Sequence, residues 1–209
     1  MILFSIKNLN FQNILQYPDI EIPADGVTFI CGESGSGKST LLKLLNGVLS
    51  STTGQILYQS RAIEKYEPIE LRREVLLVSQ SVYLFDKSIK ENFDEYYAYR
   101  DLKPVDEETM KRYLEVCALD LPLDSLCSVM SGGERQRVFT AINLSYQPQV
   151  LMMDEPTSAL DDKNSDALIN NIKAFCKANG ITLIVVSHDK SIAEKYADRI
   201  IDLTGGTKQ

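Results

Sequence analysis

The sequence has no excess of basic residues. It contains 22 Lys and Arg against 29 Asp and Glu, which gives a formal net charge of −7. Sequence-independent binding of nucleic acid needs a basic stripe that follows the phosphate backbone, so this balance argues against a nucleic-acid partner. Binding of a single nucleotide stays open, because such a site depends on a few local residues. The acidic balance otherwise favours solubility.

Long apolar runs and paired cysteines are also missing. No run approaches the roughly 20 apolar residues that span a bilayer. Residues 1–7 lack the basic start and the long apolar stretch of a signal peptide. Cysteines occur only at positions 31, 117, 127 and 176, with no C-x-x-C pair. This pattern favours reduced cytosolic thiols over a disulfide framework or a zinc site.

Short apolar stretches alternate with helical patterns along most of the chain. Several stretches are apolar at consecutive positions, which is typical of central strands covered on both faces. The alternation predicts an α/β fold with a largely parallel sheet. Strands are expected at residues 4–9, 20–22, 27–31, 55–58, 75–79, 150–153, 182–186 and 200–203.

The middle of the chain has a different character. Residues 88–121 are charged and helical in period, and Asp106 begins a helix with acids in its first turn. We interpret this segment as a helical insertion between core strands. The sequence therefore predicts one domain over residues 1–209, with a helical subdomain at about 81–145.

A glycine-rich loop is the strongest functional signal. Between an expected strand and an expected helix the chain reads G-E-S-G-S-G-K-S-T, which matches the phosphate-loop pattern G-x-x-x-x-G-K-[ST]. Lys38 is expected to reach the β- and γ-phosphates, and the Ser39 hydroxyl is expected to bind Mg²⁺. Taken alone, the loop leaves open a kinase, a GTPase, a motor or a transporter ATPase. The predicted nucleotide-binding residues are Gly32, Glu33, Ser34, Gly35, Ser36, Gly37, Lys38, Ser39 and Thr40.

Two carboxylates, Asp154 and Glu155, directly follow the strand expected at 150–153. Ligands of open α/β sheets bind at the carboxyl ends of strands. An acid at this place supports Mg²⁺ in phosphate-loop enzymes, which predicts that role for Asp154. A carboxylate beside the γ-phosphate orients or deprotonates the attacking water, which predicts that role for Glu155. Acids after a strand are common, so the prediction depends on the pairing with the phosphate loop.

A second glycine-containing helix start lies at Ser131, Gly132 and Gly133. A capping box from Ser131 to Glu134 explains the serine and the glutamate. It leaves unexplained two glycines, each of which costs roughly 1 kcal/mol relative to alanine in a helix. Close approach of an anion to backbone N–H groups explains them. Because one nucleotide rarely needs two helix starts from one chain, we expect this one to serve a nucleotide held by another copy.

Two polar residues follow other expected strands. His188 is the only histidine and comes just after the strand at 182–186. Its imidazole can donate a hydrogen bond to a γ-phosphate or to the attacking water, although a lone histidine is more often structural. Gln80 follows the strand at 75–79, and its amide can contact Mg²⁺ or the water. Taken singly, Gln80 has a structural interpretation.

Together these residues resemble the ATP-binding subunit of ABC transporters, over essentially the whole chain. The signature motif is diagnostic, because other phosphate-loop families lack it. The matching segments follow the order of the family with ordinary spacing: the phosphate loop at 32–40, the Q-loop at Gln80, the signature at 130–134, Walker B at 151–155, the D-loop at 158–161 and the switch histidine His188.

The resemblance implies a P-loop NTPase core with a mostly parallel sheet, an N-terminal antiparallel β subdomain and a helical subdomain insertion. It implies an ATP hydrolase that uses ATP and Mg²⁺, lies on the cytoplasmic face of the cell membrane and powers transport through a separate permease. Two copies are expected to pack head to tail. Ser131 and Gly133 of one copy then face the phosphate loop of the other, and Asp161 crosses the interface.

The resemblance also implies individual roles at the site. Glu155 is the expected catalytic base, and His188 is expected to hold the γ-phosphate and the water. Gln80 is expected to bind Mg²⁺ and, with the helical block, to sense the permease near residues 83–92. The adenine-stacking aromatic is assigned to Phe11, with Tyr17 as the alternative; an aromatic residue there is also an ordinary core residue.

The chain departs from the family pattern at two places. Met130 and Glu134 replace the usual ends of the Leu-Ser-Gly-Gly-Gln signature, and residues 141–144 lack the arginine often found there. Two other classes stay in competition with a transporter subunit. One is a soluble ABC-type ATPase that acts on nucleic acid or ribosomes, and the other is a small-molecule kinase built on the same loop.

Overall fold

The structure is a computed structural model that describes residues 1–203. Its centre is a five-stranded parallel sheet in the order β10-β4-β9-β8-β7. Residues 204–209 of the predicted domain lie outside the described residues. The strands are β4 (Val27–Cys31), β7 (Val75–Val78), β8 (Val150–Asp154), β9 (Thr182–Val186) and β10 (Arg199–Asp202).

Strands β4, β7, β8 and β9 are buried on both faces, whereas the edge strand β10 is mostly exposed. Alternate residues along the buried strands enter two different hydrophobic cores: Leu151 and Met153 of β8 face one core, and Val150 and Met152 face the other. Strands covered on both sides need apolar residues at consecutive positions, because successive side chains point to opposite faces. This explains the uninterrupted apolar runs in the sequence.

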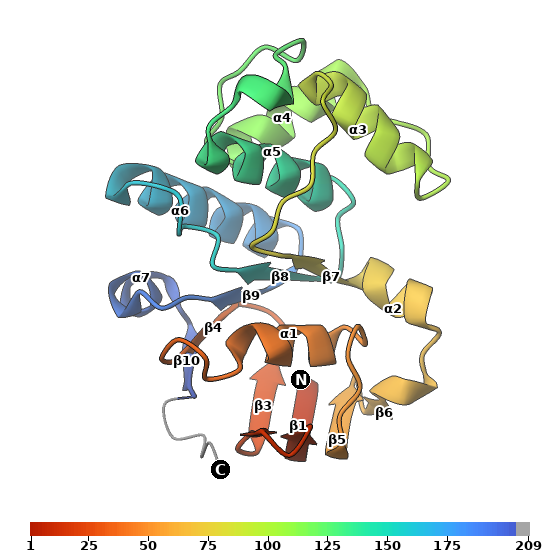
Figure 1. The fold of residues 1–209 in the computed structure, drawn as a ribbon, viewed down its shortest axis with the longest axis vertical. Coiled ribbons are helices and arrows are strands. Elements are labelled where there is room, and N and C mark those ends of the chain that lie inside the picture. The colour runs from red at the N-terminus through yellow and green to blue at the C-terminus, as the bar shows by residue number, and fades with distance from the viewer. Residues whose placement is uncertain (204–209) are drawn as a thin grey trace.

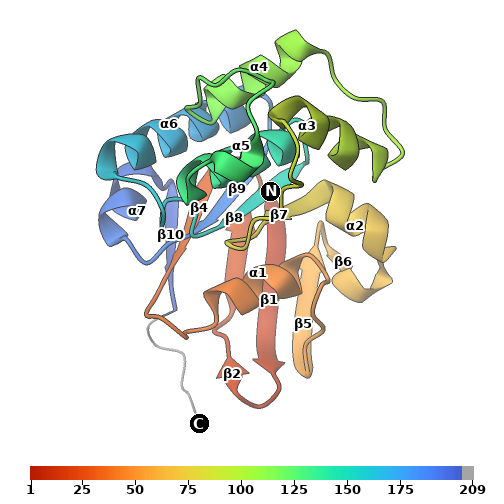
Figure 2. The same ribbon diagram turned by 45° about the horizontal axis from the view of Figure 1, so that its top comes forward.

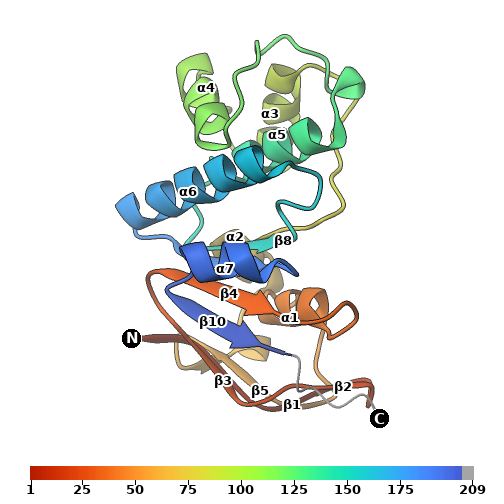
Figure 3. The same cartoon turned by 90° about the vertical axis from the view of Figure 1, so that its left-hand side faces the viewer.

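A second, antiparallel sheet forms the N-terminal part of the chain. In it β1 (Ile2–Phe11) pairs with β2 (Leu15–Gln16), β3 (Ile20–Pro23) and β5 (Thr53–Tyr58), and β5 pairs with β6 (Arg61–Ala62). Helix α1 (Lys38–Leu45) lies between the two sheets (Figures 1 and 3). Its buried leucines 41, 42, 44 and 45 join the second core to both sheets.

Helices α3 to α7 pack on the other face of the parallel sheet, whereas Leu71 of α2 belongs to the same core as α1. Helices α3, α4 and α5 gather at one end of the molecule, and α6 lies beside α4 (Figures 1 and 2). A short 3₁₀ turn, η1 (Ile63–Lys65), precedes α2, and another, η2 (Cys127–Val129), precedes α5. The helices are α2 (Pro68–Glu74), α3 (Ile89–Ala98), α4 (Glu107–Val116), α5 (Gly132–Leu144), α6 (Asp162–Ala178) and α7 (Lys190–Tyr196).

The predicted fold class is confirmed: the chain is α/β, with a parallel core sheet and an antiparallel N-terminal sheet. The eight expected strands are present within two residues of their predicted ends, and Asp106 caps α4 as expected. Only the two-residue strands β2 and β6 were not predicted. Helices α3 to α5 fall inside residues 81–145, and their status as a subdomain stays a prediction. Within residues 1–203 no helix combines the length and hydropathy that a membrane span requires.

Candidate functional site

The predicted phosphate loop connects β4 to α1. Gly35 and Gly37 have φ of 78° and 92°, a region that side chains rarely adopt. The buried ammonium of Lys38 donates to the carbonyl oxygens of Gly32 (2.8 Å) and Glu33 (3.0 Å). The loop therefore curls around its own lysine at the N-terminus of α1, where backbone N–H groups and the helix dipole favour an anion.

Tyr17 holds the end of this loop. Its buried hydroxyl donates to the carbonyl oxygen of Gly37 at 2.9 Å. A Cβ at Gly37 would lie 2.7 Å from that hydroxyl oxygen and 2.9 Å from Leu15 Cδ1, so only glycine fits. Burial raises the pKa of Tyr17, which keeps the phenol protonated as a donor. Tyr17 thus stabilises the end of the phosphate loop through this hydrogen bond.

Asp154 and Ser39 connect the end of β8 to the start of α1. The Ser39 hydroxyl donates to Asp154 Oδ1 at 2.9 Å, and the Asp154 side chain is buried. Burial raises the pKa of Asp154, the nearby Glu155 charge raises it further, and the Ser39 hydrogen bond opposes the shift. Two of the three predicted metal ligands, Ser39 and Asp154, are therefore adjacent, and a cation between them would relieve a desolvated carboxylate.

Glu155 and His188 form the second polar pair of the site. Glu155 Oε2 lies 2.6 Å from His188 Nδ1 and 3.4 Å from the backbone N of His188. The Glu155 side chain is 14% exposed and that of His188 is 68% exposed, so the imidazole forms the open side of the pair. The structure thus brings together the predicted base and the predicted switch histidine.

The backbone of Glu155 is held in a strained conformation. Its φ is 52°, a left-handed value that is uncommon for a residue other than glycine. Its N–H donates to Val186 O (3.0 Å), and its carbonyl accepts from Ser158 Oγ (3.0 Å) and Gln136 Nε2 (3.3 Å). These bonds to three other segments fix the direction in which the carboxylate points.

A cavity of about 520 Å³ unites these groups. It extends from the phosphate loop to Gln80 and to the Glu155–His188 pair, so three predicted polar residues from separate strand ends share one space. Its lining also contains Ser158 of the predicted D-loop and two residues that were not predicted, Ile14 and Leu15 of the β1–β2 hairpin. The full lining consists of Ile14, Leu15, Ser34, Gly35, Gly37, Lys38, Ser39, Thr40, Gln80, Glu155, Ser158 and His188.

Phe11 has a different place from the predicted one. It is not among the described residues that line the cavity; it is partly buried and packs against the second core. The reason is hairpin register, because Phe11 pairs with Leu15 across a tight turn that presents Ile14 instead. The adenine-stacking role predicted for Phe11 has no support in this geometry, and the alternative, Tyr17, is used to hold Gly37.

The signature residues lie at the start of α5, outside the cavity lining in residues 1–203. The predicted capping box is present: Glu134 N donates to Ser131 Oγ (3.3 Å), and Ser131 N donates to Glu134 Oε2 (2.9 Å). A Cβ on Gly133 would lie 2.9 Å from the carbonyl oxygen of Ala159, whereas one on Gly132 would meet nothing within 4 Å. Packing within the chain therefore explains why position 133 is glycine. No contact within the described chain explains why position 132 is glycine.

Asp161, the predicted D-loop residue, lies at the N-cap of α6. Its exposed carboxylate accepts from Asn164 N and Asn164 Nδ2, each at 2.8 Å. These hydrogen bonds lower its pKa, so the carboxylate stays charged over a wide pH range. Asp161 does not line the cavity in the described part of the chain.

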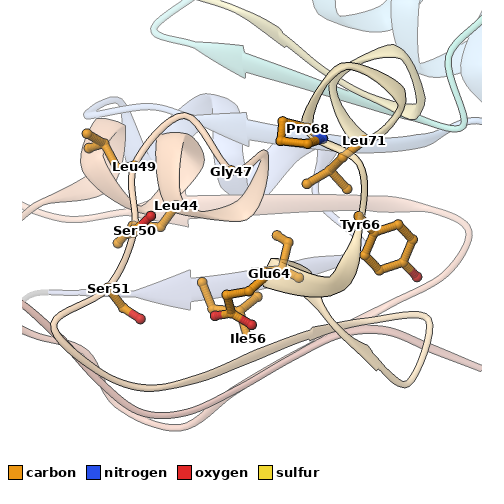
Figure 4. A pocket seen from close by; sticks show the side chains of 11 residues that line it. Leu44, Gly47, Leu49, Ser50, Ser51, Ile56, Glu64, Tyr66, Pro68 and Leu71 are labelled. Atoms are coloured by element: carbon orange, nitrogen blue, oxygen red, sulfur yellow. The ribbon is translucent and has the colours of Figure 1, made fainter.

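A second cavity of about 230 Å³ lies between α1, β5 and α2 (Figure 4). Leu44, Ile56 and Leu71 form its apolar wall, and Glu64 and Ser51 add polar groups. It shares no residue with the phosphate-loop cavity and contains neither a cationic side chain nor a glycine loop of the phosphate-binding kind. It therefore gives no sign of a nucleotide site.

The strand–loop–helix geometry, the buried Lys38 and the Ser39–Asp154 pair define a P-loop nucleotide-binding protein. The family model described as "ABC transporter" matches residues 15–158. The energy-coupling factor transporter ATP-binding protein EcfA2 of Clostridium perfringens is 34% identical, over 96% of this chain and 76% of its own length. The glutamine transport ATP-binding protein GlnQ of Bacillus subtilis is 32% identical, over 99% and 88%.

Solved structures agree with these sequence relatives. CbiO1 from Clostridium perfringens, part of the ABC transporter complex CbiONQ, superposes with a TM-score of 0.83 at 27% identity, over 96% of this chain and 84% of that one. The chain belongs to the ABC transporter ATP-binding family. It is an ATP-binding protein with the ATPase activity of that family.

Proposed function

We propose that two copies of this chain act as the head-to-tail ATPase dimer of a membrane transporter, with Mg²⁺ at each site, and drive a separate permease. The observation that carries the proposal is the cavity that joins the phosphate loop to Gln80, Glu155 and His188. EcfA2 and GlnQ are by name ATP-binding proteins of transporters, and CbiO1 is part of a transporter complex. A small-molecule kinase and a soluble ATPase acting on nucleic acid are less well supported by these relatives.

The residues of the loop fit a triphosphate. The Ser36 hydroxyl is buried and has no hydrogen-bond partner in residues 1–203, and such a group calls for an acceptor. The Lys38 ammonium is held only by carbonyl oxygens and carries an unneutralised charge. Both features are satisfied by phosphate oxygens at the N-terminus of α1. Residues 32–40 accordingly hold the phosphates of ATP.

The oxygen atoms of the Ser39–Asp154 pair fit Mg²⁺. Hydroxyl and carboxylate oxygens are the ligands that Mg²⁺ prefers, and the cation usually binds through one or two carboxylates together with substrate phosphates. The described residues contain no cluster of three His, Cys, Asp or Glu residues that could hold a metal alone, which fits a cation shared with the substrate. Ser39 and Asp154 would hold it, with the Gln80 amide beside them. Bound Mg²⁺ neutralises charge on the phosphates.

Hydrolysis needs a base for the attacking water. Glu155 is the only acidic residue in the described lining of the cavity, since Asp154 is turned toward Ser39. The 2.6 Å contact with His188 orients its carboxylate, and hydrogen bonds of its backbone hold the point from which the side chain extends. We assign Glu155 as general base. His188 orients the base and provides a donor toward the γ-phosphate.

Exposed residues at the start of α5 and at the D-loop support the dimer. No contact within the described chain requires glycine at position 132, and Ser131, Gly132 and Asp161 are all exposed. In the head-to-tail arrangement these residues cover the open side of the partner's cavity, and the start of α5 contributes N–H donors to the partner's ATP. Gln80 and residues 83–92 contact the permease, which places the chain on the cytoplasmic face of the membrane.

Light scattering of the Glu155→Gln variant tests this proposal. With Mg-ATP the mass should double from the monomer value of 23.5 kDa, because the variant binds ATP without consuming it. Adding Ser131→Arg should abolish the doubling, since the arginine fills the second anion site. Ser50→Arg, at an exposed serine after α1, is the matched control and should leave it intact. An unchanged mass with and without Mg-ATP contradicts the dimer.

A further inference from the structure

We infer that Ile14 forms the base-side wall of the nucleotide cavity, and that this chain therefore distinguishes weakly between ATP and other nucleoside triphosphates. The inference rests on the proposed nucleotide site. The phosphate loop fixes one end of the ligand, and the two apolar side chains of the lining, Ile14 and Leu15, come from the β1–β2 hairpin beside that loop. The base is the largest apolar surface of a nucleotide, so it belongs against these side chains.

The β1–β2 turn presents Ile14 in a fixed position. Gln12 and Asn13 have φ of 53° and 56°, and the turn closes through Ile14 N to Phe11 O at 3.0 Å. Gln12 N donates to Thr52 Oγ1 (2.7 Å), which ties the turn to the neighbouring β5 edge. The turn is thus ordered by hydrogen bonds before any ligand arrives, and its apolar tip is preorganised.

Ile14 is accessible to a ligand. It is 58% exposed and lines the cavity, whereas its neighbour Leu15 is half-buried and lies against the phosphate loop beside Gly37. The apolar surface is therefore continuous from the hairpin tip to the loop. A base laid on it covers both side chains and gains apolar burial.

No side chain at this end of the described cavity can recognise the edge of a base. Every polar residue of the lining belongs to the phosphate loop, to Gln80 or to the catalytic group around Glu155. Strong discrimination between similar ligands requires buried donors and acceptors that the wrong ligand leaves unpaired. Apolar contact alone distinguishes bases only by the apolar surface area that each base buries.

The described lining of the cavity also offers no aromatic side chain on which a base could stack. Within the described residues no Phe or Tyr lines the cavity, since Phe11 packs into the core and Tyr17 holds Gly37. Base–aromatic stacking is worth about 1–3 kcal/mol per base, or roughly five-fold or more in affinity. The chain therefore relies on its phosphate contacts for most of its affinity, and these contacts are common to all triphosphates.

Calorimetric titration of the full chain with Mg-ATP, Mg-GTP and Mg-UTP tests the inference. The three dissociation constants should agree within roughly five-fold. Ile14→Ser should weaken all three by a similar factor of several-fold, and Ile14→Tyr should tighten ATP by roughly five-fold or more. Ile69→Tyr, on α2, is the matched control, because Ile69 is 56% exposed and does not line the cavity. It should change none of the constants.

The outcomes separate the inference from the proposal beneath it. Tight binding of ATP with at least twenty-fold weaker binding of both GTP and UTP overturns the inference, as does an Ile14→Ser variant that binds ATP like the wild type. Lys38→Ala should abolish binding of all three nucleotides. Unchanged binding in Lys38→Ala would refute the nucleotide site itself, and with it the inference.

Discussion

The Glu155 carboxylate and the His188 imidazole lie 2.6 Å apart, from Oε2 to Nδ1, at the ends of two neighbouring parallel strands. The strand register explains this contact. Asp154 of β8 pairs with Val186 of β9, so the residues that follow the two strands emerge at the same edge of the sheet. The proposed base and the residue proposed to orient it are thus positioned by the ends of two paired strands.

Glu155→Gln should lower ATP turnover by about 10²- to 10⁴-fold, the usual contribution of a general base. The amide keeps the size and most of the hydrogen bonding of the carboxylate but cannot take a proton. Binding of Mg-ATP should persist, because the phosphate loop is unchanged. Steady-state phosphate release and calorimetric titration measure the two effects. Wild-type turnover in this variant would remove Glu155 from the mechanism.

Asp154→Asn should stabilise the protein without nucleotide while weakening its binding of Mg-ATP. The buried carboxylate is desolvated, and its raised pKa shows that the folded state disfavours the charged form. Asparagine removes the charge and can still accept the Ser39 hydrogen bond. Each kcal/mol gained raises the melting temperature of a chain of this size by about 2–4 °C. Thermal unfolding without ligand checks the gain, and titration with Mg-ATP checks the loss.

The stability difference between Asp154→Asn and the wild type should depend on pH. The folded protein retains the Asp154 proton to a higher pH than the unfolded chain, whose aspartate has its ordinary pKa of about 3.8. Wild-type stability therefore falls as pH rises from that value through the raised folded pKa. The two proteins should converge in acid and differ most near neutral pH. A difference that is constant with pH contradicts this origin.

Much of this site could be predicted from the sequence, because its signals are local. The phosphate loop, Asp154, Glu155 and His188 each follow an apolar strand, and parallel strands bring their ends to one edge. Ile14 could not be found in this way. The turn before it uses Gln12 and Asn13 in left-handed conformations where glycine is usual, so the register of the hairpin was hidden.

The reason for the signature glycines could not be predicted fully from the sequence. Glycine is unfavourable in a helix at both positions, but at Gly133 it is required by the carbonyl of Ala159, which lies in a different segment. Nothing in the local pattern names that partner. Glycine is required both where another backbone segment packs closely and where a ligand approaches the backbone, so the sequence alone does not distinguish the two causes.

Asn92 should prove essential for the segment between β7 and α3. It is fully buried, its amide oxygen accepts from Phe85 N at 2.8 Å, and its Nδ2 donates to Ser88 O at 2.9 Å and Phe85 O at 3.2 Å. Asn92→Ala leaves these groups unpaired and should destabilise the fold by about 2–3 kcal/mol. Urea unfolding measures the change. Asn170→Ala, at an exposed asparagine of α6, is the control and should stay within about 0.5 kcal/mol of wild type.

The two signature glycines should respond oppositely to alanine. At Gly133 the new Cβ lies 2.9 Å from the Ala159 carbonyl oxygen and 2.6 Å from Leu160 Cδ2, so backbone must move. Gly133→Ala should therefore destabilise the monomer by about 1–3 kcal/mol. Gly132 faces open space, and Gly132→Ala should be neutral or stabilising by up to about 1 kcal/mol through helix propensity.

Unfolding and dimerisation assays on the same pair of variants separate fold from function. Gly132→Ala should keep the stability of the monomer but reduce ATP-dependent dimerisation of Glu155→Gln, because its methyl group occupies the space that the partner's nucleotide needs. Gly133→Ala should affect both. If Gly132→Ala left dimerisation at full strength, the open space above Gly132 would have no ligand to accommodate. The start of α5 would then be a capped helix end alone, and the shared nucleotide site would have to lie elsewhere.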